Sequence, residues 1–213
     1  MSGKVAVVDY GMGNLRSVWQ ALAHVAGGRE VVVTADPAEL RAAERVVFPG
    51  QGAMPDCMRE LELRGLRRAV LDAARDKPFL GICIGRQMLF EHSAEGDVPG
   101  LGVFAGQVVR FPAEHMRTAD GSKLKVPHMG WNEVAQTRSH PLWQGIADRS
   151  RFYFVHSYCV EPVERPVIAG TTDYGVAFTS AVARDNIFAI QCHPEKSAQA
   201  GLALLSNFIR WKP

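Results

Sequence analysis

The first half of the chain alternates short runs of β-branched residues with stretches of helical periodicity. In the helical stretches the apolar residues recur at a spacing that places them on one face of a helix. Such alternation predicts a parallel sheet with helices on both of its faces. Strands are expected at residues 4–9, 30–34, 45–50 and 78–83, and helices at residues 15–26 and 66–76.

From about residue 103 the pattern changes to strand-like runs separated by short turns, which favour antiparallel hairpins. These runs lie at residues 106–111, 151–160, 166–172, 176–184 and 186–191, and an amphipathic helix is expected at 198–211. The predicted fold class is therefore α/β, with a mostly parallel central sheet, helices on both faces and an added antiparallel region. Residues 112–126 are the best candidate for a mobile surface loop.

Length and charge limit the classes of protein to which the chain can belong. Its 213 residues, 47% of them hydrophobic, suit one domain spanning residues 1–213. The 24 basic and 22 acidic residues give a net charge of +2, which is too balanced for a nucleic-acid binder. No apolar run reaches the roughly 18 residues of a membrane span, and the N-terminal apolar stretch is too short for a signal peptide. Four scattered cysteines without a CxxC pair indicate reduced thiols, so a cytoplasmic protein is expected.

One cysteine stands between two glycines in the segment FLGICIGRQMLF, residues 79–90. The G-x-C-x-G pattern has the layout of a nucleophile elbow, in which glycines permit a sharp turn from strand to helix. We expect a helix to begin at Arg86. The helix N-terminus would favour the thiolate of Cys83, and the N–H group of Ile84 could hold an oxyanion. An inert buried cysteine between packing glycines explains the pattern about equally well.

His193 is the histidine best placed to assist such a thiol. It follows the apolar run NIFAIQC, and Pro194 locks the segment that leads to Glu195. An extended His-Pro-Glu segment points imidazole and carboxylate to the same side, so Glu195 can orient the ring as in a catalytic triad. Taken alone, the segment is more often a simple turn at the end of a strand.

A glycine-rich segment, FPGQGAM at residues 48–54, follows another expected strand. Glycines let the backbone turn outward and offer its N–H groups to a ligand. Gln51 or Gly52 could therefore supply a second oxyanion donor opposite Cys83. Taken alone, an ordinary glycine-rich turn is the better explanation.

Together and in this order, P-G-x-G, G-x-C-x-G-x-Q and H-P-E resemble the class I glutamine amidotransferases, which use a catalytic triad. Further stretches resemble the glutaminase subunits of imidazole glycerol phosphate synthases in histidine biosynthesis, and the similarity covers nearly the whole chain. These stretches are DYGMGNLRSV (9–18), PHMGWNEV (127–134), YFVHSY (153–158) and QCHPEKS (191–197).

The resemblance implies roles for individual residues. Cys83 would be the nucleophile, His193 the general base and acid, and Glu195 its orienting carboxylate. Glutamine would be bound by Gly50, Gly52, Gln87, His156, Ser157 and Tyr158, and the oxyanion by Gln51, Gly52 and Ile84. The chemistry of these residues needs no metal and no organic cofactor, and no cluster in the sequence offers metal ligands at useful spacing. Two residues depart from the family pattern, since Gln51 and Cys192 stand where apolar and aromatic residues are common.

The implied reaction is hydrolysis of the side-chain amide of L-glutamine through a cysteine thioester. The ammonia would pass to a (β/α)8-barrel synthase on a separate chain, in a heterodimer whose overall products are glutamate, imidazole glycerol phosphate and an aminoimidazole carboxamide ribotide. Contacts with this partner are expected at Asn14, Trp131 and Lys196. The plainer alternatives are a helix-capping Asn, a partly buried Trp and a solvated Lys.

Three other functions stay open at this point. The same triad could serve a different synthase, such as pyridoxal phosphate synthase or anthranilate synthase. A self-sufficient cysteine hydrolase would act at full speed without any partner. A redox-sensing or scaffolding protein, whose reactive thiol is itself the function, would keep that function in a His193→Ala variant.

Overall fold

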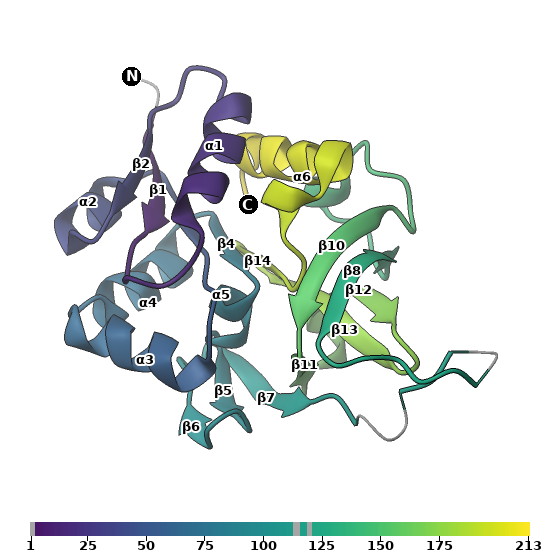
Figure 1. Ribbon diagram of the computed structural model, residues 1–213. Helices are drawn as coiled ribbons and strands as arrows, with labels where there is room; N and C mark the ends of the chain where they lie inside the picture. The colour runs from purple at the N-terminus through teal and green to yellow at the C-terminus, as the bar shows by residue number, and fades with distance from the viewer. Residues whose placement is uncertain (1–2, 113–115, 119–120) are drawn as a thin grey trace.

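Five neighbouring strands of a large mixed sheet run parallel, in the order β2-β1-β3-β4-β14 (Figure 1). The computed structural model describes residues 3–112, 116–118 and 121–213. Every residue of β1, β3, β4 and β14 is buried, as expected for parallel strands covered on both faces. The strands are β1 (Val5–Val8), β2 (Val31–Thr34), β3 (Arg45–Phe48), β4 (Phe79–Ile82) and β14 (Ile187–Ile190).

Helices cover both faces of these parallel strands. On one face α1 lies beside α6, and α2, α3 and α4 lie on the other (Figure 1). The longer helices bury residues three or four positions apart, as Val18 and Leu22 do in α1, whereas the short α2 buries Leu40. The helices are α1 (Leu15–Val25), α2 (Pro37–Ala42), α3 (Met54–Leu63), α4 (Arg67–Asp76) and α6 (Ala198–Arg210).

Beyond β14 the sheet continues as β13-β11-β7-β5-β6, in which every neighbouring pair except β5 and β7 is antiparallel. The bounds are β5 (Phe90–Ser93), β6 (Val98–Pro99), β7 (Phe104–Arg110), β11 (Tyr158–Pro162) and β13 (Ala177–Arg184). At the side, β12 (Ile168–Asp173) pairs with both β13 and β9 (Ala135–Gln136). The 3-10 turns within the described residues are η1 (Pro141–Trp143), η2 (Arg165–Val167) and η3 (Pro194–Lys196). The predicted fold class is confirmed.

A separate two-stranded antiparallel sheet consists of β8 (His128–Glu133) and β10 (Arg151–His156). The prediction of one strand over residues 151–160 is therefore wrong. The strand is interrupted at Ser157, because β10 ends in the small sheet at His156 and β11 begins in the large sheet at Tyr158. His156 pairs with His128, whereas Tyr158 pairs with Arg110.

The expected helix beginning at Arg86 is also wrong. Only the single turn α5 (Ile84–Gln87) forms, and β5 begins at Phe90. The carbonyl groups that would continue the helix are used elsewhere, since the Met88 carbonyl accepts the N–H of Leu101 at 2.8 Å. Helices α2 and α3 are not among the elements expected from the sequence, although α3 buries Met54, Cys57, Met58 and Leu61 at helical spacing.

The expected surface loop at 112–126 lies in part outside the described residues. Within its described part, Arg117 and Lys123 form an antiparallel bridge, and the N–H of Leu124 donates to the Met116 carbonyl at 2.9 Å.

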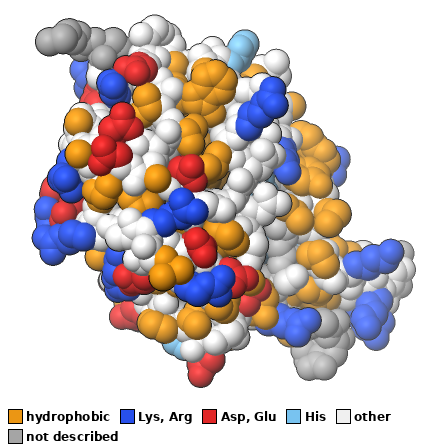
Figure 2. Space-filling model, turned by 60° about the vertical axis from the view of Figure 1, so that its left-hand side comes forward, with side chains coloured by type: hydrophobic (Ala, Val, Ile, Leu, Met, Phe, Trp, Pro, Cys, Tyr) orange, Lys and Arg blue, Asp and Glu red, His pale blue; other side chains and the backbone are white. Residues whose placement is uncertain are grey.

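Basic and acidic side chains are interspersed over the left and centre of the face shown in Figure 2. Basic and acidic side chains also form ion pairs, such as that of Arg64, just after α3, with Glu60 and that of Arg68 with Asp72 on α4. Exposed pairs of this kind add little to stability. Among the described residues, no helix is both long enough and apolar enough to cross a membrane.

Candidate active site

Cys83 stands at a sharp turn between β4 and α5. Its backbone angles are φ 54° and ψ −115°, a region that residues other than glycine rarely adopt. Such strain costs on the order of 1–3 kcal/mol and is concentrated at functional sites. The Cys83 N–H donates to the Ile190 carbonyl at 2.9 Å, which holds the turn against β14.

The two glycines beside Cys83 permit close packing around the turn. A Cβ on Gly85 would collide with the Phe48 carbonyl oxygen, and a Cβ on Gly81 would lie 2.9 Å from Cβ of Ala189. The elbow is therefore packed directly against the neighbouring strands β3 and β14.

His193 follows β14, the strand next to β4, and Ile190 pairs with Ile82 in register. Nδ1 of His193 lies 2.8 Å from Oε1 of Glu195. The His193 backbone is held on both sides, because its N–H donates to the Tyr153 carbonyl at 2.9 Å and its carbonyl accepts from Oγ of Ser197 at 2.6 Å. Nε2 of His193 is left without a hydrogen-bond partner in the protein.

The electrostatics of His193 favour its protonated form. Burial by itself would lower the pKa of His193. Attraction to the negative charge of the Cys83 sulfur and the hydrogen bond to Glu195 outweigh burial and raise the pKa of His193 to about 10. The ring is thus ready to give up a proton to a leaving group.

Cys83 and His193 line the same cavity, which has a volume of about 240 Å³. Three adjacent parallel strands bring the three sequence motifs together, since β3, β4 and β14 end at the same edge of the sheet. The other residues in the lining are Gln51, Gly52, Ile84, Gln87, Glu95, Pro127, Val155, His156, Ser157 and Tyr158.

The glycine-rich loop after β3 packs against the start of α5. A Cβ on Gly50 would collide with the hydroxyl of Tyr10 and would lie 3.0 Å from the backbone nitrogen of Gly85. Gly50 is thus buried behind the cavity, whereas Gly52, with φ 115°, reaches its wall. Ile84 begins α5, so its N–H has no acceptor inside the helix.

The Tyr158 carbonyl oxygen in the cavity wall is the hydrogen-bond acceptor for both Gln87 and His156. Nε2 of Gln87 lies 3.2 Å from the Tyr158 carbonyl, and Nδ1 of His156 lies 2.8 Å from it. A carbonyl only accepts, so Nδ1 of His156 carries a proton. The Oε1 atom of Gln87 is buried without a partner.

A second buried histidine continues this chain toward the surface. Nδ1 of His128 lies 3.0 Å from Nε2 of His156, and Nδ2 of Asn132 lies 3.3 Å from Nε2 of His128. Burial lowers the pKa of His128 to about 4 and also lowers that of His156, so both rings are neutral near pH 7. With both rings neutral, every hydrogen bond in the chain has one donor and one acceptor, running from Asn132 to Tyr158.

Acid is expected to destabilise the fold through this chain. Because the pKa of His128 is depressed from 6.5 to about 4 in the folded state, the unfolded chain binds more protons over that range. The contribution of His128 is present above pH 6.5 and is lost as the pH falls toward 4. We expect the free energy of unfolding to fall more steeply over this range in the wild type than in His128→Gln, as measured by urea denaturation. Equal slopes would contradict the assignment.

Glu95 is a cavity residue that sequence reasoning missed. It lies in the turn between β5 and β6, and its Oε2 atom accepts the N–H of Met54 at 2.9 Å. No motif surrounds Glu95, so nothing in the local sequence distinguishes it from other surface acids. Glu95 is the carboxylate among the residues that line the cavity, since Glu195 lies behind His193.

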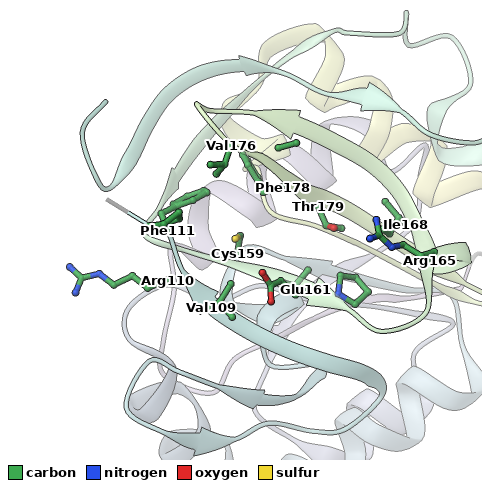
Figure 3. Close-up of a pocket in the computed structure, with 14 residues that line it drawn as sticks. Val109, Arg110, Phe111, Cys159, Glu161, Arg165, Ile168, Val176, Phe178 and Thr179 are labelled. Atoms are coloured by element: carbon green, nitrogen blue, oxygen red, sulfur yellow. The ribbon is translucent and has the colours of Figure 1, made fainter. Parts of the chain in front are cut away.

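A larger cavity, of about 640 Å³, lies elsewhere between the β7–β11 and β12–β13 pairs (Figure 3). Cys159 and Glu161 project into it from β11, and Phe178 and Thr179 from β13. None of the predicted site residues lines this cavity. Chemistry therefore favours the smaller cavity as the active site, despite the usual preference for the largest one.

The expected partner-contact residues are only partly brought together. The Trp131 ring lies edge-on to Tyr153 at 6.2 Å, and Nζ of Lys196 lies 5.9 Å from the centre of the same Tyr153 ring. Trp131 is 44% exposed. Asn14 instead caps α1, its Oδ1 accepting the N–H of Ser17 at 3.4 Å, as in the plainer alternative for this residue.

The two departures from the family pattern behave differently. Gln51 is exposed at the cavity, and its carbonyl accepts from Sγ of Cys57 at 3.7 Å. Cys192 is buried, and burial together with the charge of Glu195 raises its pKa, so its thiol stays protonated and unreactive near pH 7. In the described part of the chain, no group of three or more His, Cys, Asp or Glu side chains is arranged to hold a metal ion.

Comparison with known proteins gives close relatives. The chain is 71% identical over 209 residues to the imidazole glycerol phosphate synthase subunit HisH of Dechloromonas aromatica (strain RCB), covering 98% of this chain and 97% of that protein. It is 59% identical over 209 residues to the subunit of the same name from Nitrosomonas europaea, covering 98% and 99%.

Solved structures support the fold. PurLQS from Thermotoga maritima superposes with a TM-score of 0.71 at 18% identity, covering 99% of each chain. A structure described as glutamine amidotransferase gives a TM-score of 0.69 at 16% identity, covering 92% of this chain and 94% of that one. Residues 6–211 match the family model described as glutamine amidotransferase class-I. This match spans nearly the whole chain and agrees with the resemblance found in the sequence, so the protein belongs to the class I glutamine amidotransferases.

Proposed function

We propose that this protein is the glutaminase subunit of an imidazole glycerol phosphate synthase and releases ammonia from L-glutamine for a separate synthase subunit. Relatives at 59–71% identity over nearly the full chain bear the name of that subunit. The observation that carries the chemistry is the strained Cys83 elbow opening into one cavity with the hydrogen-bonded His193–Glu195 pair.

In the acylation step, the Cys83 thiolate attacks the side-chain carbonyl carbon of glutamine. A C–S bond forms, and the carbonyl oxygen becomes an oxyanion that accepts N–H groups from Ile84 and from the Gln51–Gly52 segment. When the intermediate collapses, the C–N bond breaks and the His193 imidazolium gives its proton to the departing nitrogen. Ammonia leaves, and the glutamyl group remains on Cys83 as a thioester.

In the deacylation step, neutral His193 takes a proton from water as that water attacks the thioester carbonyl. The C–S bond then breaks, so glutamate leaves and the thiolate–imidazolium pair is restored. Glu195 keeps the proton of His193 on Nδ1, which leaves Nε2 free for both proton transfers. The proposed chemistry draws on side chains and backbone N–H groups, without a metal or organic cofactor.

The cavity supplies complementary groups for the amino-acid end of glutamine. The Glu95 carboxylate is suited to the α-ammonium group, and the free Oε1 atom of Gln87 can accept a further N–H of the substrate. Residues 156–158 also line the cavity, where the hydrogen bonds to the Tyr158 carbonyl fix the backbone. Gly50 shapes the loop from behind without lining the cavity.

We further propose that residues 1–213 act as one glutamine amidotransferase domain in the cytoplasm, where the four free cysteines stay reduced. Its proposed partners are L-glutamine and a (β/α)8-barrel synthase subunit in a heterodimer, with no role for nucleic acid or a membrane. A protein partner is chemically sensible because ammonia released into water is protonated and lost as a nucleophile.

Trp131, Lys196 and Asn14 are the proposed contacts with this barrel subunit. Large, partly exposed aromatic residues often dominate the binding energy of an interface. We expect Trp131→Ala and Lys196→Ala to weaken partner-stimulated glutaminase activity, with Trp131→Ala raising the partner concentration needed for half-maximal stimulation by about tenfold or more. Glutamate release during titration with the synthase subunit measures the effect.

The control for this prediction is Val163→Ala. Val163 is 71% exposed and lies just after β11. Its replacement should leave stimulation unchanged, and all three variants should unfold at the same urea concentration as the wild type. Unchanged stimulation in both Trp131→Ala and Lys196→Ala would remove these residues from the interface.

The proposed function is tested by measuring glutamate release with and without the barrel synthase and its nucleotide ligand. We expect slow release by the isolated chain and marked stimulation by the liganded partner. Full activity without a partner would indicate a self-sufficient cysteine hydrolase. Stimulation by a different synthase, added in a parallel reaction, would overturn the assignment to histidine biosynthesis.

A further inference from the structure

Arg86 carries a positive charge into the interior directly behind the nucleophile. Its side chain is 0% exposed, and no carboxylate among the described residues lies within ion-pair distance of it. Nη1 donates to the Thr179 carbonyl at 2.8 Å and Nη2 donates to Oε1 of Gln191 at 2.6 Å. Burial lowers the pKa of Arg86 to about 10, so the group is still charged near pH 7. A buried cation without an anion is costly, so its retention calls for a physical reason.

Gln191 connects this cation to the sulfur of Cys83. Its Oε1 atom accepts two N–H groups, from Nη2 of Arg86 at 2.6 Å and from Nε2 of Gln87 at 2.9 Å. With two donors at the oxygen, the orientation of the buried carboxamide is determined, and its Nε2 atom must face the other way. That nitrogen lies 3.6 Å from Sγ of Cys83.

The contact between Gln191 and Cys83 favours one protonation state. A carboxamide N–H donates only, so the sulfur must accept, and a thiolate is a far stronger acceptor than a thiol. In the same way, the Arg86 charge is attracted to the negative forms of Cys83, Cys159 and Cys192.

Among the described groups around Cys83, Arg86 and His193 are the cations. Tyr10, Cys57 and Cys192 also interact with the sulfur, but burial raises the pKa of each, so all three stay neutral near pH 7. Burial likewise raises the pKa of Cys159, beside Arg86, to about 11, and His156 is neutral. Glu95, at the cavity wall, and Glu195, behind His193, are acidic groups near the site that work against the thiolate.

We propose that Arg86 and Gln191 are positioning residues that hold the Cys83 sulfur in its ionised form from the interior side, opposite His193 in the cavity. This inference deepens the proposed function and rests on it for its biological meaning. His193 must change its charge during each turnover, whereas Arg86 does not. The interior cation therefore offers the sulfur a positive charge that stays constant through the turnover, both before acylation and as the thiolate leaves the thioester.

The test is alkylation of purified protein by iodoacetamide between pH 5 and 9.5, with the modified Cys83 peptide quantified by mass spectrometry. The comparison includes Arg86→Met, which removes the charge at similar length, and Arg86→Lys, which retains it. We expect the midpoint of the rate–pH curve at Cys83 to rise by about one pH unit in Arg86→Met, about tenfold less reaction at low pH. Arg86→Lys should restore most of the wild-type curve.

A matched control is Arg45→Met. Arg45 is also a buried arginine, but it donates to the carbonyls of Phe208 and Trp211, and its ion-pair partner is Glu44. Its loss should lower the free energy of unfolding without moving the Cys83 curve. A lower stability with an unmoved curve in Arg86→Met as well would reduce Arg86 to a structural role and overturn the proposal.

Gln191→Glu keeps the proposal testable if Arg86→Met does not fold. The carboxylate retains acceptors for Arg86 and Gln87 but removes the N–H group at the sulfur, so the midpoint should again rise. An unmoved curve in this variant would overturn the proposal. Because alkylation needs neither glutamine nor a partner, a shifted midpoint without glutaminase activity would count against the proposed function alone. Normal glutaminase activity with unmoved midpoints would count against the positioning role alone.

Discussion

Replacing Cys83 with alanine is expected to abolish partner-stimulated glutamate release, with a loss of at least about 10⁴-fold. Without the sulfur no thioester can form, and the His193–Glu195 pair has no nucleophile to activate. The fold should survive, since alanine is smaller than cysteine and leaves the close packing of Gly81 and Gly85 against β14 and β3 unchanged. A coupled assay for glutamate, with urea denaturation as a check of folding, measures both effects.

The matched control is Cys159→Ala. Cys159 is another buried free cysteine, but it lines the larger cavity rather than the active one. Its replacement should leave glutamate release within about twofold of the wild type. Residual activity in Cys83→Ala comparable to that in Cys159→Ala would mean that another group is the nucleophile.

Replacing Glu195 with glutamine is expected to lower the turnover rate by about 10²–10⁴-fold with little change in the Michaelis constant. Glu195 accepts the Nδ1 proton of His193, and its loss removes both the preferred tautomer and the charge that supports the imidazolium. The pH dependence of turnover should change as well, because the charge of Glu195 helps to raise the pKa of His193.

Glu161→Gln serves as the control for this change, since Glu161 lines the larger cavity. It should leave both kinetic constants unchanged. The contrary outcome, a Glu195→Gln enzyme with an ordinary turnover rate and a raised Michaelis constant, would assign Glu195 to substrate binding rather than to orienting His193.

The meeting of the three motifs could be predicted from the sequence because each directly follows a buried parallel strand. Parallel strands align their carboxyl ends, so Cys83 and His193 meet once β4 and β14 are neighbours. The pairing of those two strands is itself a tertiary event, between segments more than one hundred residues apart. Local sequence patterns thus identify Cys83 and His193 as candidates, whereas the order of strands in the sheet brings them close together.

Other parts of the site leave no local signal. Arg86 follows a glycine in a helix-like segment and looks like an ordinary exposed arginine, because only the distant Gln191 and Thr179 explain its burial. Glu95 is one of many acids in turns. The break at Ser157 is also hidden, since the surrounding run of aromatic and β-branched residues reads as one continuous strand.

That break has a mechanical consequence for the pocket. Val155 and His156 belong to the small β8–β10 sheet, whereas Tyr158 belongs to the large one, so one wall of the pocket spans two separately hydrogen-bonded bodies. The same small sheet displays Trp131 on its outer surface. A protein that binds Trp131 would therefore contact the same small sheet that contributes Val155 and His156 to the pocket wall. A slight rotation of that sheet relative to the large one would change the size of the pocket without the folding or unfolding of any segment.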